Sequence, residues 1–221
     1  GRVVTNGMSQ YSRNERNANA GMVVGIEPSD FPVHDRAAWI AAFGEGDGTA
    51  LHEEALTLSA QGTVHPLAGI VLQRQLESKA FIEGGQDYQA PAQRVEDFLS
   101  RRPSTQLGCV LPSYRPGVRA TDLSRVLPDY AVQAMREALP AFGRKIRGYD
   151  MNDALMTGVE TRTSSPLRIP RGQDLQSTNT SGLYPAGEGA SYAGGILSAG
   201  VDGIKVAEAV AMALIATPKT E

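Results

Sequence analysis

The residues best suited to bind a ligand lie in a glycine-rich stretch near the end of the sequence. The first group follows a short apolar run, and the second opens a helical pattern that continues to about residue 216. The candidate cofactor-binding residues are Gly187, Glu188, Gly189, Ala190, Gly194, Gly195 and Ile196. A strand, a glycine turn and a helix in this order leave unpaired backbone N–H groups at the helix N-terminus, where the helix dipole favours an anion or an electron-rich carbonyl.

Two interpretations of this stretch are open on spacing alone. The glycines either serve only a crowded turn and a close contact between helix and sheet, or they admit a ligand to the backbone. Glu188 bears on the choice, because a phosphate would repel its carboxylate whereas sugar or ribityl hydroxyls would donate hydrogen bonds to it. A hydroxyl-rich, electron-accepting cofactor would suit both the carboxylate and the helix N-terminus.

A second candidate group, Arg162, Ser164 and Ser165, follows a predicted strand and could donate hydrogen bonds to an anionic substrate or to a cofactor. The alternative is a cluster at an edge strand and turn ahead of Pro166. The sequence predicts no catalytic acid or base, because Tyr, His and Asp residues are scattered and no spacing brings two together.

The histidines and the cysteine exclude several other chemistries. His34, His52 and His65 lie far apart and lack the spacing of a zinc motif, so we expect no metal site. A single cysteine, Cys109, excludes a disulfide-stapled secreted fold and favours a reducing, cytoplasmic compartment. We expect Cys109 to be a buried small side chain rather than a reactive thiol.

Composition indicates an ordinary globular protein. The chain has 221 residues, 41% of them hydrophobic, and a formal net charge of -3. It is long enough to bury a core and not basic enough to coat nucleic acid, and charged residues interrupt the last helical pattern, so we expect neither a nucleic-acid partner nor a membrane span. The chain begins Gly1-Arg2 without an initiator Met, and we expect it to be part of a longer protein.

Three segments would position the candidate residues. Residues 1–34 contain two short β-type runs, 2–5 and 21–26, around a polar stretch, which is typical of a hairpin. Residues 35–150 are mainly helical. Helices are predicted over 65–83, 91–100 and 128–142, with Pro140 kinking or ending the last one and a loop at 44–48.

Residues 151–221 change character again. Strands are predicted at 154–163 and 182–186, with an extended run at 166–170, a turn at 172–174 and the long helix at the end. The order of elements predicts an α+β or α/β fold: a largely helical domain followed by a strand, turn and helix. We also expect an exposed sheet edge at the 182–186 strand, covered by self-association into a homo-oligomer.

At the glycine-rich stretch the sequence resembles the C-terminal FAD-binding segment of the uncharacterised FAD-dependent dehydrogenases, within the wider group of two-dinucleotide-fold flavoproteins. The resemblance rests on GLYPAGEGA at 182–190, YAGGI at 192–196, SA at 198–199 and DG at 202–203. Further blocks in the same order are NGMS at 6–9, NANA at 17–20, PAQRV at 91–95, DFL at 97–99, PSYRPG at 112–117 and TGVETRTSSP at 157–166.

The resemblance implies an FAD cofactor and hydride transfer to or from an unidentified small molecule. It implies that residues 187–189 lie at the ribityl and pyrophosphate side, and that the backbone N–H groups of 194–196 face the N1/C2 carbonyl edge of the flavin. It also implies that 1–34 and 35–150 form a substrate-side domain, and that 151–221 are the C-terminal portion of the FAD-binding domain. Family members open with a strand and a GxGxxG turn, which are absent here, so we expect this fragment to be inactive alone.

Two other classes of function remain open. The chain could be a non-catalytic binding or interaction module, which an exposed patch of Trp39, Phe43 and Tyr114 would favour. It could instead bind a nucleotide or a phosphorylated ligand without redox chemistry, because a glycine-rich helix N-terminus does not by itself select flavin.

Overall fold

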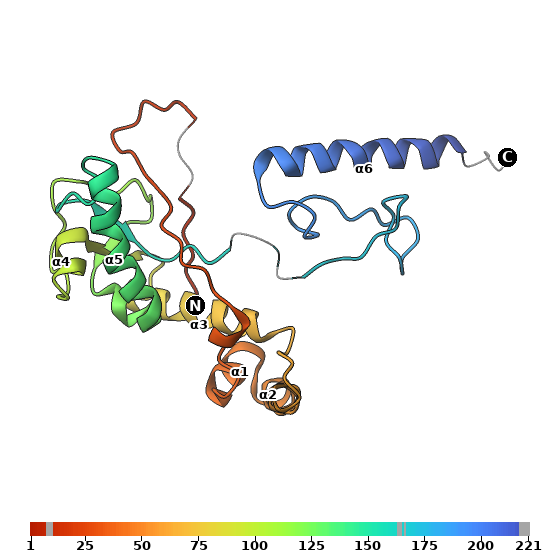
Figure 1. Ribbon diagram of the computed structural model, residues 1–221, viewed down its shortest axis with the longest axis horizontal. Helices are drawn as coiled ribbons and strands as arrows, with labels where there is room; N and C mark the ends of the chain where they lie inside the picture. The colour runs from red at the N-terminus through yellow and green to blue at the C-terminus, as the bar shows by residue number, and fades with distance from the viewer. Residues whose placement is uncertain (8–10, 163–164, 166, 217–221) are drawn as a thin grey trace. The chain divides into compact units, whose positions relative to one another are not determined.

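The computed structural model describes residues 1–7, 11–162, 165 and 167–216. The chain divides into two compact units, Gly1–Thr161 and Arg162–Glu221. In the described residues, six α-helices and a small three-stranded sheet confirm the predicted mixture of helix and strand (Figure 1). The functional assignment of the three segments stays a prediction.

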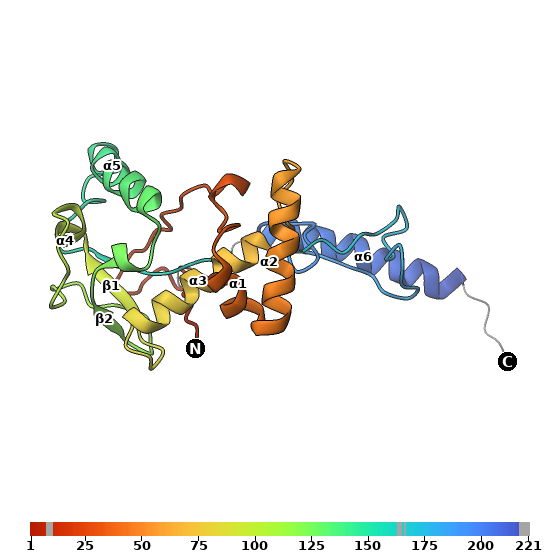
Figure 2. The same cartoon turned by 90° about the horizontal axis from the view of Figure 1, so that it is seen from below.

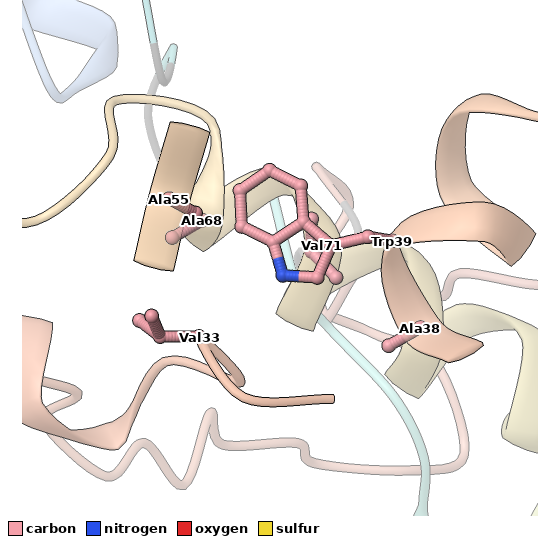
Figure 3. Packing of buried hydrophobic residues seen from close by; sticks show 6 residues of the cluster. All are labelled: Val33, Ala38, Trp39, Ala55, Ala68 and Val71. Carbon is pink, nitrogen blue, oxygen red and sulfur yellow. The ribbon is translucent and has the colours of Figure 1, made fainter. Parts of the chain in front are cut away.

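The first three helices of the first unit pack around Trp39. They are α1 (Arg36–Phe43), α2 (Glu45–Ala60) and α3 (Ala68–Glu83). Figure 3 shows the indole ring of Trp39 among the side chains of Val33, Ala55, Ala68 and Val71. Trp39 is fully buried and its indole N–H donates to the carbonyl of Pro32 at 3.0 Å. Trp39 therefore cannot belong to an exposed aromatic patch, which would have favoured a non-catalytic binding module.

The loop predicted at 44–48 is also wrong, because α2 begins at Glu45. Only Gly44 lies between α1 and α2, and its φ of +91° is a conformation that favours glycine. Acidic residues in the first turn favour the N-terminus of α2. A Cβ at Gly48 would lie 2.6 Å from the Cα of Ile40, so a glycine here permits close packing of α2 on α1.

The sheet of the first unit has the order β2-β1-β3. The central strand β1 (Ala90–Arg94) pairs in parallel with β2 (Val118–Ala120), in the register Ala90 with Val118. It pairs antiparallel with β3 (Leu155–Thr157), in the register Ala92 with Thr157. Figure 2 shows β1 and β2 side by side. The strand predicted over 154–163 is thus shorter than expected.

The helix predicted over 91–100 is half wrong, because β1 occupies its first half and α4 (Val95–Leu99) its second half. A proline is unusual in a central strand because it has no N–H to donate. Pro91 precedes the residues of β1 that pair with β3, and its carbonyl still accepts from Gly158 N–H at 3.0 Å. The strand therefore tolerates this proline.

Two predicted helices are confirmed. Helix α3 covers most of the predicted 65–83 and ends at Gly84. Two short 3-10 turns lie at Pro28–Asp30, before α1, and at Leu123–Arg125, before α5. Helix α5 spans Asp129–Lys145. It buries Val132 and Leu139 in a cluster with Phe98, as the amphipathic pattern predicts. The helix does not end at Pro140 but continues to Lys145.

The prediction of an N-terminal hairpin is wrong, because the described parts of residues 1–34 contain no strand. The backbone donors of this segment bond elsewhere in the first unit. Val3 N–H donates to the carbonyl of Glu77 in α3 at 3.1 Å, and Thr5 N–H donates to the carbonyl of Val159 at 2.9 Å. Residues 1–7 are thus held by α3 and by the chain after β3, and the described parts of residues 1–34 are called the N-terminal arm below.

The second unit contains α6 (Ile196–Ala216), which confirms the long C-terminal helix. A turn forms at residues 173–174 as predicted. The strand predicted at 182–186 is wrong: these residues are irregular, and the nearest ladder is an isolated bridge between Arg171 and Ser177. The exposed sheet edge expected there is not formed, and self-association stays a prediction.

Two glycines of α2 give a matched test of its packing on α1. We expect Gly48→Ala to lower the free energy of unfolding by about 1–3 kcal/mol, because the new methyl group would meet the backbone of Trp39 and Ile40. Gly46→Ala should be neutral or stabilising by up to about 1 kcal/mol, because a Cβ at Gly46 meets no atom within 4 Å. Urea titrations followed by the emission of Trp39, the only tryptophan, measure both. Equal effects would contradict this packing.

Candidate functional site

The predicted glycine turn is formed in the second unit. Gly187 has a φ of +63°. Ser191 N–H donates to the carbonyl of Glu188 at 3.0 Å, and Tyr192 N–H donates to the carbonyl of Gly187 at 3.0 Å. These bonds close residues 187–192 into a compact loop, and a Cβ at Gly187 would lie 3.8 Å from the Cβ of Ala199 in α6. The turn therefore lies against the N-terminal half of α6.

An ion pair between Arg171 and Asp202 fixes the turn to α6. The guanidinium is bidentate on the carboxylate, with Nη1 to Oδ2 at 3.0 Å and Nη2 to Oδ1 at 2.5 Å. The same Oδ2 accepts from Gly187 N–H at 2.8 Å. Arg171 Nη1 also donates to the carbonyl of Pro185 at 2.7 Å. One buried ion pair thus connects the chain before the turn, the turn itself and the helix.

The surroundings of Asp202 favour its charged form. The hydrogen bonds from the Arg171 guanidinium and from Gly187 N–H lower the pKa of Asp202 to about 2, and this effect exceeds the opposing effect of burial. The pair raises the pKa of Arg171. Both side chains are largely buried, so this is an ion pair of good geometry rather than a solvated surface contact.

Tyr192 is the aromatic centre of the second unit. The guanidinium carbon of Arg171 lies 3.7 Å from the ring centroid of Tyr192, and that of Arg168 lies 4.6 Å from it. The phenol hydroxyl of Tyr192 accepts from the backbone N–H of Arg171 at 3.0 Å and donates to the carbonyl of Ile169 at 3.1 Å. Ile169 N–H donates to the carbonyl of Ala190 at 3.4 Å. Residues 168–171 are thereby held beside the glycine turn.

The structure leaves most of the predicted cofactor-binding residues open. Glu188, Gly189, Gly194, Gly195 and Ile196 are exposed, whereas Gly187 is half-buried. The seventh, Ala190, is buried and supports the turn. A Cβ at Gly189 would meet no atom within 4 Å, and one at Gly195 would meet only the hydroxyl of Ser198 at 3.6 Å. A ligand can therefore reach the backbone of both glycines.

The predicted substrate residues are only partly accounted for. Arg162 is the first residue of the second unit, and it is exposed. Ser164 lies outside the described residues. The hydroxyl of Ser165 donates to the carbonyl of Leu167 at 2.8 Å and accepts from its N–H at 3.3 Å, so it stabilises a local turn. A role for these residues in substrate binding stays a prediction.

In the first unit, the chain after β3 joins segments that are distant in sequence. Gly7 N–H donates to the carboxylate of Glu160 at 3.2 Å. Thr161 donates from its hydroxyl to Glu77 at 2.9 Å and accepts from the Gln73 amide at 2.9 Å. Glu77 is almost completely buried in α3. The N-terminal arm, α3 and residues 159–161 therefore form one hydrogen-bonded frame.

The N-terminal arm also contacts the loop before β2. Arg16 donates to the carbonyl of Pro112 at 2.8 Å, and Asn17 donates to the carbonyl of Leu111 at 2.5 Å. The Asn19 amide donates to the carbonyl of Gly7. Sequence blocks that carry the resemblance and lie far apart in the chain therefore meet within the first unit.

The prediction that Cys109 is buried is wrong, because Cys109 is exposed. Its backbone N–H donates to Asp153 at 2.5 Å, and this loop position keeps the side chain out of the core. The hydrogen bond from the thiol to the Asp153 carboxylate raises the pKa of Cys109, which disfavours the reactive thiolate.

The described part of the chain contains neither a cluster of metal-ligating side chains nor a helix able to span a membrane. No three His, Cys, Asp or Glu side chains there are grouped closely enough to hold a metal ion. Within the same residues, no helix combines the length and hydropathy needed to cross a membrane.

The sequence analysis missed the residues that fix the site. Arg171 had no assigned role, and Asp202 and Tyr192 were named only within the pattern of the last helix and the resemblance. Arg171 and Asp202 are separated by 31 positions, so no local spacing announces their pairing. The available signal was the presence of two acidic residues, Asp202 and Glu208, within a helix whose other residues are mostly small or apolar.

The pairing of Asp202 predicts a defined response to acid. Because its pKa is lower in the folded state than its usual value of about 4, the pair contributes stability above pH 4 and loses it as the pH falls toward 2. The expected loss is on the order of 2 kcal/mol. Hydrogen exchange at Gly187 N–H, corrected for its intrinsic rate, should therefore accelerate through this range.

Asp202→Asn is the control, because an amide oxygen still accepts from Gly187 N–H but does not titrate. We expect faster exchange than in the wild type at pH 6 and no acid step. An acid step of equal size in both proteins would assign the effect to another carboxylate.

Comparison with known proteins gives two findings. A family model described as "FAD-dependent protein, C-terminal domain-like" matches residues 1–46 and 49–163. An uncharacterized protein of Clostridium beijerinckii is 46% identical over 208 residues, which are 94% of this chain and 33% of the relative. The chain thus spans about a third of the length of that relative.

The two matches differ in extent. The glycine turn and α6 lie beyond the residues that the family model matches. The alignment with the relative extends into the second unit, because it covers more residues than Gly1–Thr161 contains. With well over half of its residues matched, the chain belongs to the FAD-dependent protein, C-terminal domain-like family.

Proposed function

We propose that this chain is the C-terminal part of an FAD-dependent oxidoreductase of the dehydrogenase type, which transfers hydride between the flavin and a small molecule. Membership of an FAD-dependent family supports the cofactor, and a relative about three times as long supports a larger parent protein. The exposed Cys109 fits a reducing compartment such as the cytoplasm. The observation that carries the proposal is the open glycine turn fixed against α6 by Asp202.

The residues at the turn fit a flavin dinucleotide. Gly189 and Gly195 give access to the backbone because no side chain would be displaced by a ligand. Glu188 is exposed in the middle of the turn, where its carboxylate can accept hydrogen bonds from ribityl or ribose hydroxyls. The exposed first turn of α6 supplies backbone donors and the positive end of a helix dipole for the carbonyl edge of the ring.

FAD, when bound, would supply the hydride chemistry, and this chain would hold and orient it. The N-terminus of α6 would favour negative charge on the ring by about 0.3–2 kcal/mol, the usual size of a helix-dipole effect. The ion pair of Arg171 and Asp202 would keep the turn and the helix at a fixed separation. Small errors in such positioning are costly in catalysis, so a rigid connection is useful.

The exposed side of α6 supports packing against further protein. Among its residues, Leu197, Ile204, Leu214 and Ile215 are strongly exposed, whereas the helix buries only Val206. This reverses the pattern of an ordinary surface helix, whose apolar side faces its own core. We propose that the rest of the dinucleotide fold, in the part of the longer protein outside this chain, covers this side.

Two glycines, one directly before α6 and one inside it, provide a test of the flavin site. We expect Gly195→Val, made in the longer protein, to lower flavin occupancy at least tenfold, because a branched side chain would block the backbone at the helix N-terminus. The variant should still fold, since a Cβ there meets only Ser198. Occupancy is measured from the visible flavin bands relative to protein.

Gly200→Val is the matched control, because Gly200 lies inside α6, five residues after Gly195, and a Cβ there also has open space. It introduces the same branched side chain away from the helix N-terminus and should keep its flavin. Full occupancy in Gly195→Val would overturn this placement of the flavin. A wild-type protein that binds no flavin would overturn the proposed function and favour a binding module or a non-redox nucleotide site.

A further inference from the structure

We propose that Arg168 binds a phosphate group of the dinucleotide at the glycine turn. This inference rests on the proposed function, because it assigns one residue to the FAD that the function requires. Arg168 is exposed, and its guanidinium carbon lies 4.6 Å from the ring centroid of Tyr192. Among the described residues it has no carboxylate partner, so its charge and donors are available to a ligand.

The nearby acid is already committed. Both oxygens of Asp202 accept from Arg171, and Oδ2 also accepts from Gly187 N–H. The charge of Arg171 is therefore neutralised, and its side chain is buried within the unit. The guanidinium of Arg168, the other one near Tyr192, carries an uncompensated positive charge. The two arginines differ in role: Arg171 holds the turn in place and Arg168 faces solvent.

The position of Arg168 places it beside the turn. The next residue, Ile169, donates from its N–H to the carbonyl of Ala190, the last of the candidate residues 187–190. Tyr192, on which Arg168 stacks, donates from its N–H to the carbonyl of Gly187 at the start of the turn. Arg168 is thus tied to both ends of the turn through short chains of contacts.

The chemistry of the group fits a phosphate oxyanion. A guanidinium presents a planar fork of N–H donors that matches two oxygens of one phosphate. Stacking on Tyr192 restricts its motion, so less entropy is lost when it binds. The positive charge of Arg168 also offsets the repulsion that the Glu188 carboxylate would exert on a phosphate. The same turn can therefore bind hydroxyl groups through Glu188 and a phosphate through Arg168.

The experiment compares ligands that share the flavin ring but differ in phosphate. Flavin-free preparations of the longer protein are titrated with FAD, FMN and riboflavin, and binding is followed by the quenching of flavin fluorescence. For Arg168→Met we expect the Kd for FAD to rise roughly ten- to a hundredfold, the usual size for loss of a charge-assisted pair, and the Kd for riboflavin to change less than twofold. Arg168→Lys should lose less than Arg168→Met because it keeps the charge.

Arg136→Met is the matched control, because Arg136 also stacks on an aromatic ring, that of Phe98 in the first unit, at 4.9 Å. It should leave all three Kd values unchanged. An unchanged Kd for FAD in Arg168→Met, including the case in which Arg168 serves an anionic substrate, overturns the inference. An equal loss for FAD and riboflavin also overturns it, since that indicates a damaged turn. Absence of flavin binding by the wild type would instead contradict the proposed function.

Discussion

The order of the second unit depends on the ion pair between Arg171 and Asp202. This unit has little apolar core of its own: α6 buries Val206, and the turn buries Ala190. A buried ion pair is often no better than apolar packing, because two charges must leave water. Here the carboxylate also accepts from Gly187 N–H and the guanidinium stacks on Tyr192, so the pair satisfies several groups together. Removing one partner would leave the other buried and unpaired.

The first unit is built on a different principle. Its helices α1, α2 and α3 surround Trp39, and α5 covers a second cluster around Phe98 and Leu139. Polar groups in this unit serve as connections between segments: the buried carboxylate of Glu77 joins α3 to Thr161, and Glu160 joins the chain after β3 to Gly7. A hydrophobic core of this kind can be stable without a ligand, whereas the second unit presents its glycine turn and apolar helix side to solvent.

The sequence predicted those elements whose signals are local. The spacing of Val132 and Leu139 shows the buried side of α5, and the glycines before residue 196 show where α6 begins. The errors arose where distant contacts decide the structure. Gly48 belongs to a helix because α1 packs closely on it, and Pro91 belongs to a strand because β2 and β3 pair around it.

The candidate site shows the same division. The open turn and the helix N-terminus could be located from glycine spacing, because backbone access is a property of the residue itself. Its supports could not be located, because the pairing of Arg171 with Asp202 depends on how residues 168–171 fold back beside the turn. The strand predicted before the turn failed for a related reason: a strand needs a partner, and residues 182–186 have none among the described residues.

The location of Asp202 couples the glycine turn to the apolar side of α6. Asp202 lies in the second turn of the helix, and its carboxylate bonds directly to the backbone of Gly187. A force that displaces α6 must therefore move the turn with it or break this bond. The helix N-terminus and the turn are therefore linked through this bond, and protein that packs on the exposed apolar residues of α6 would also affect the position of the turn.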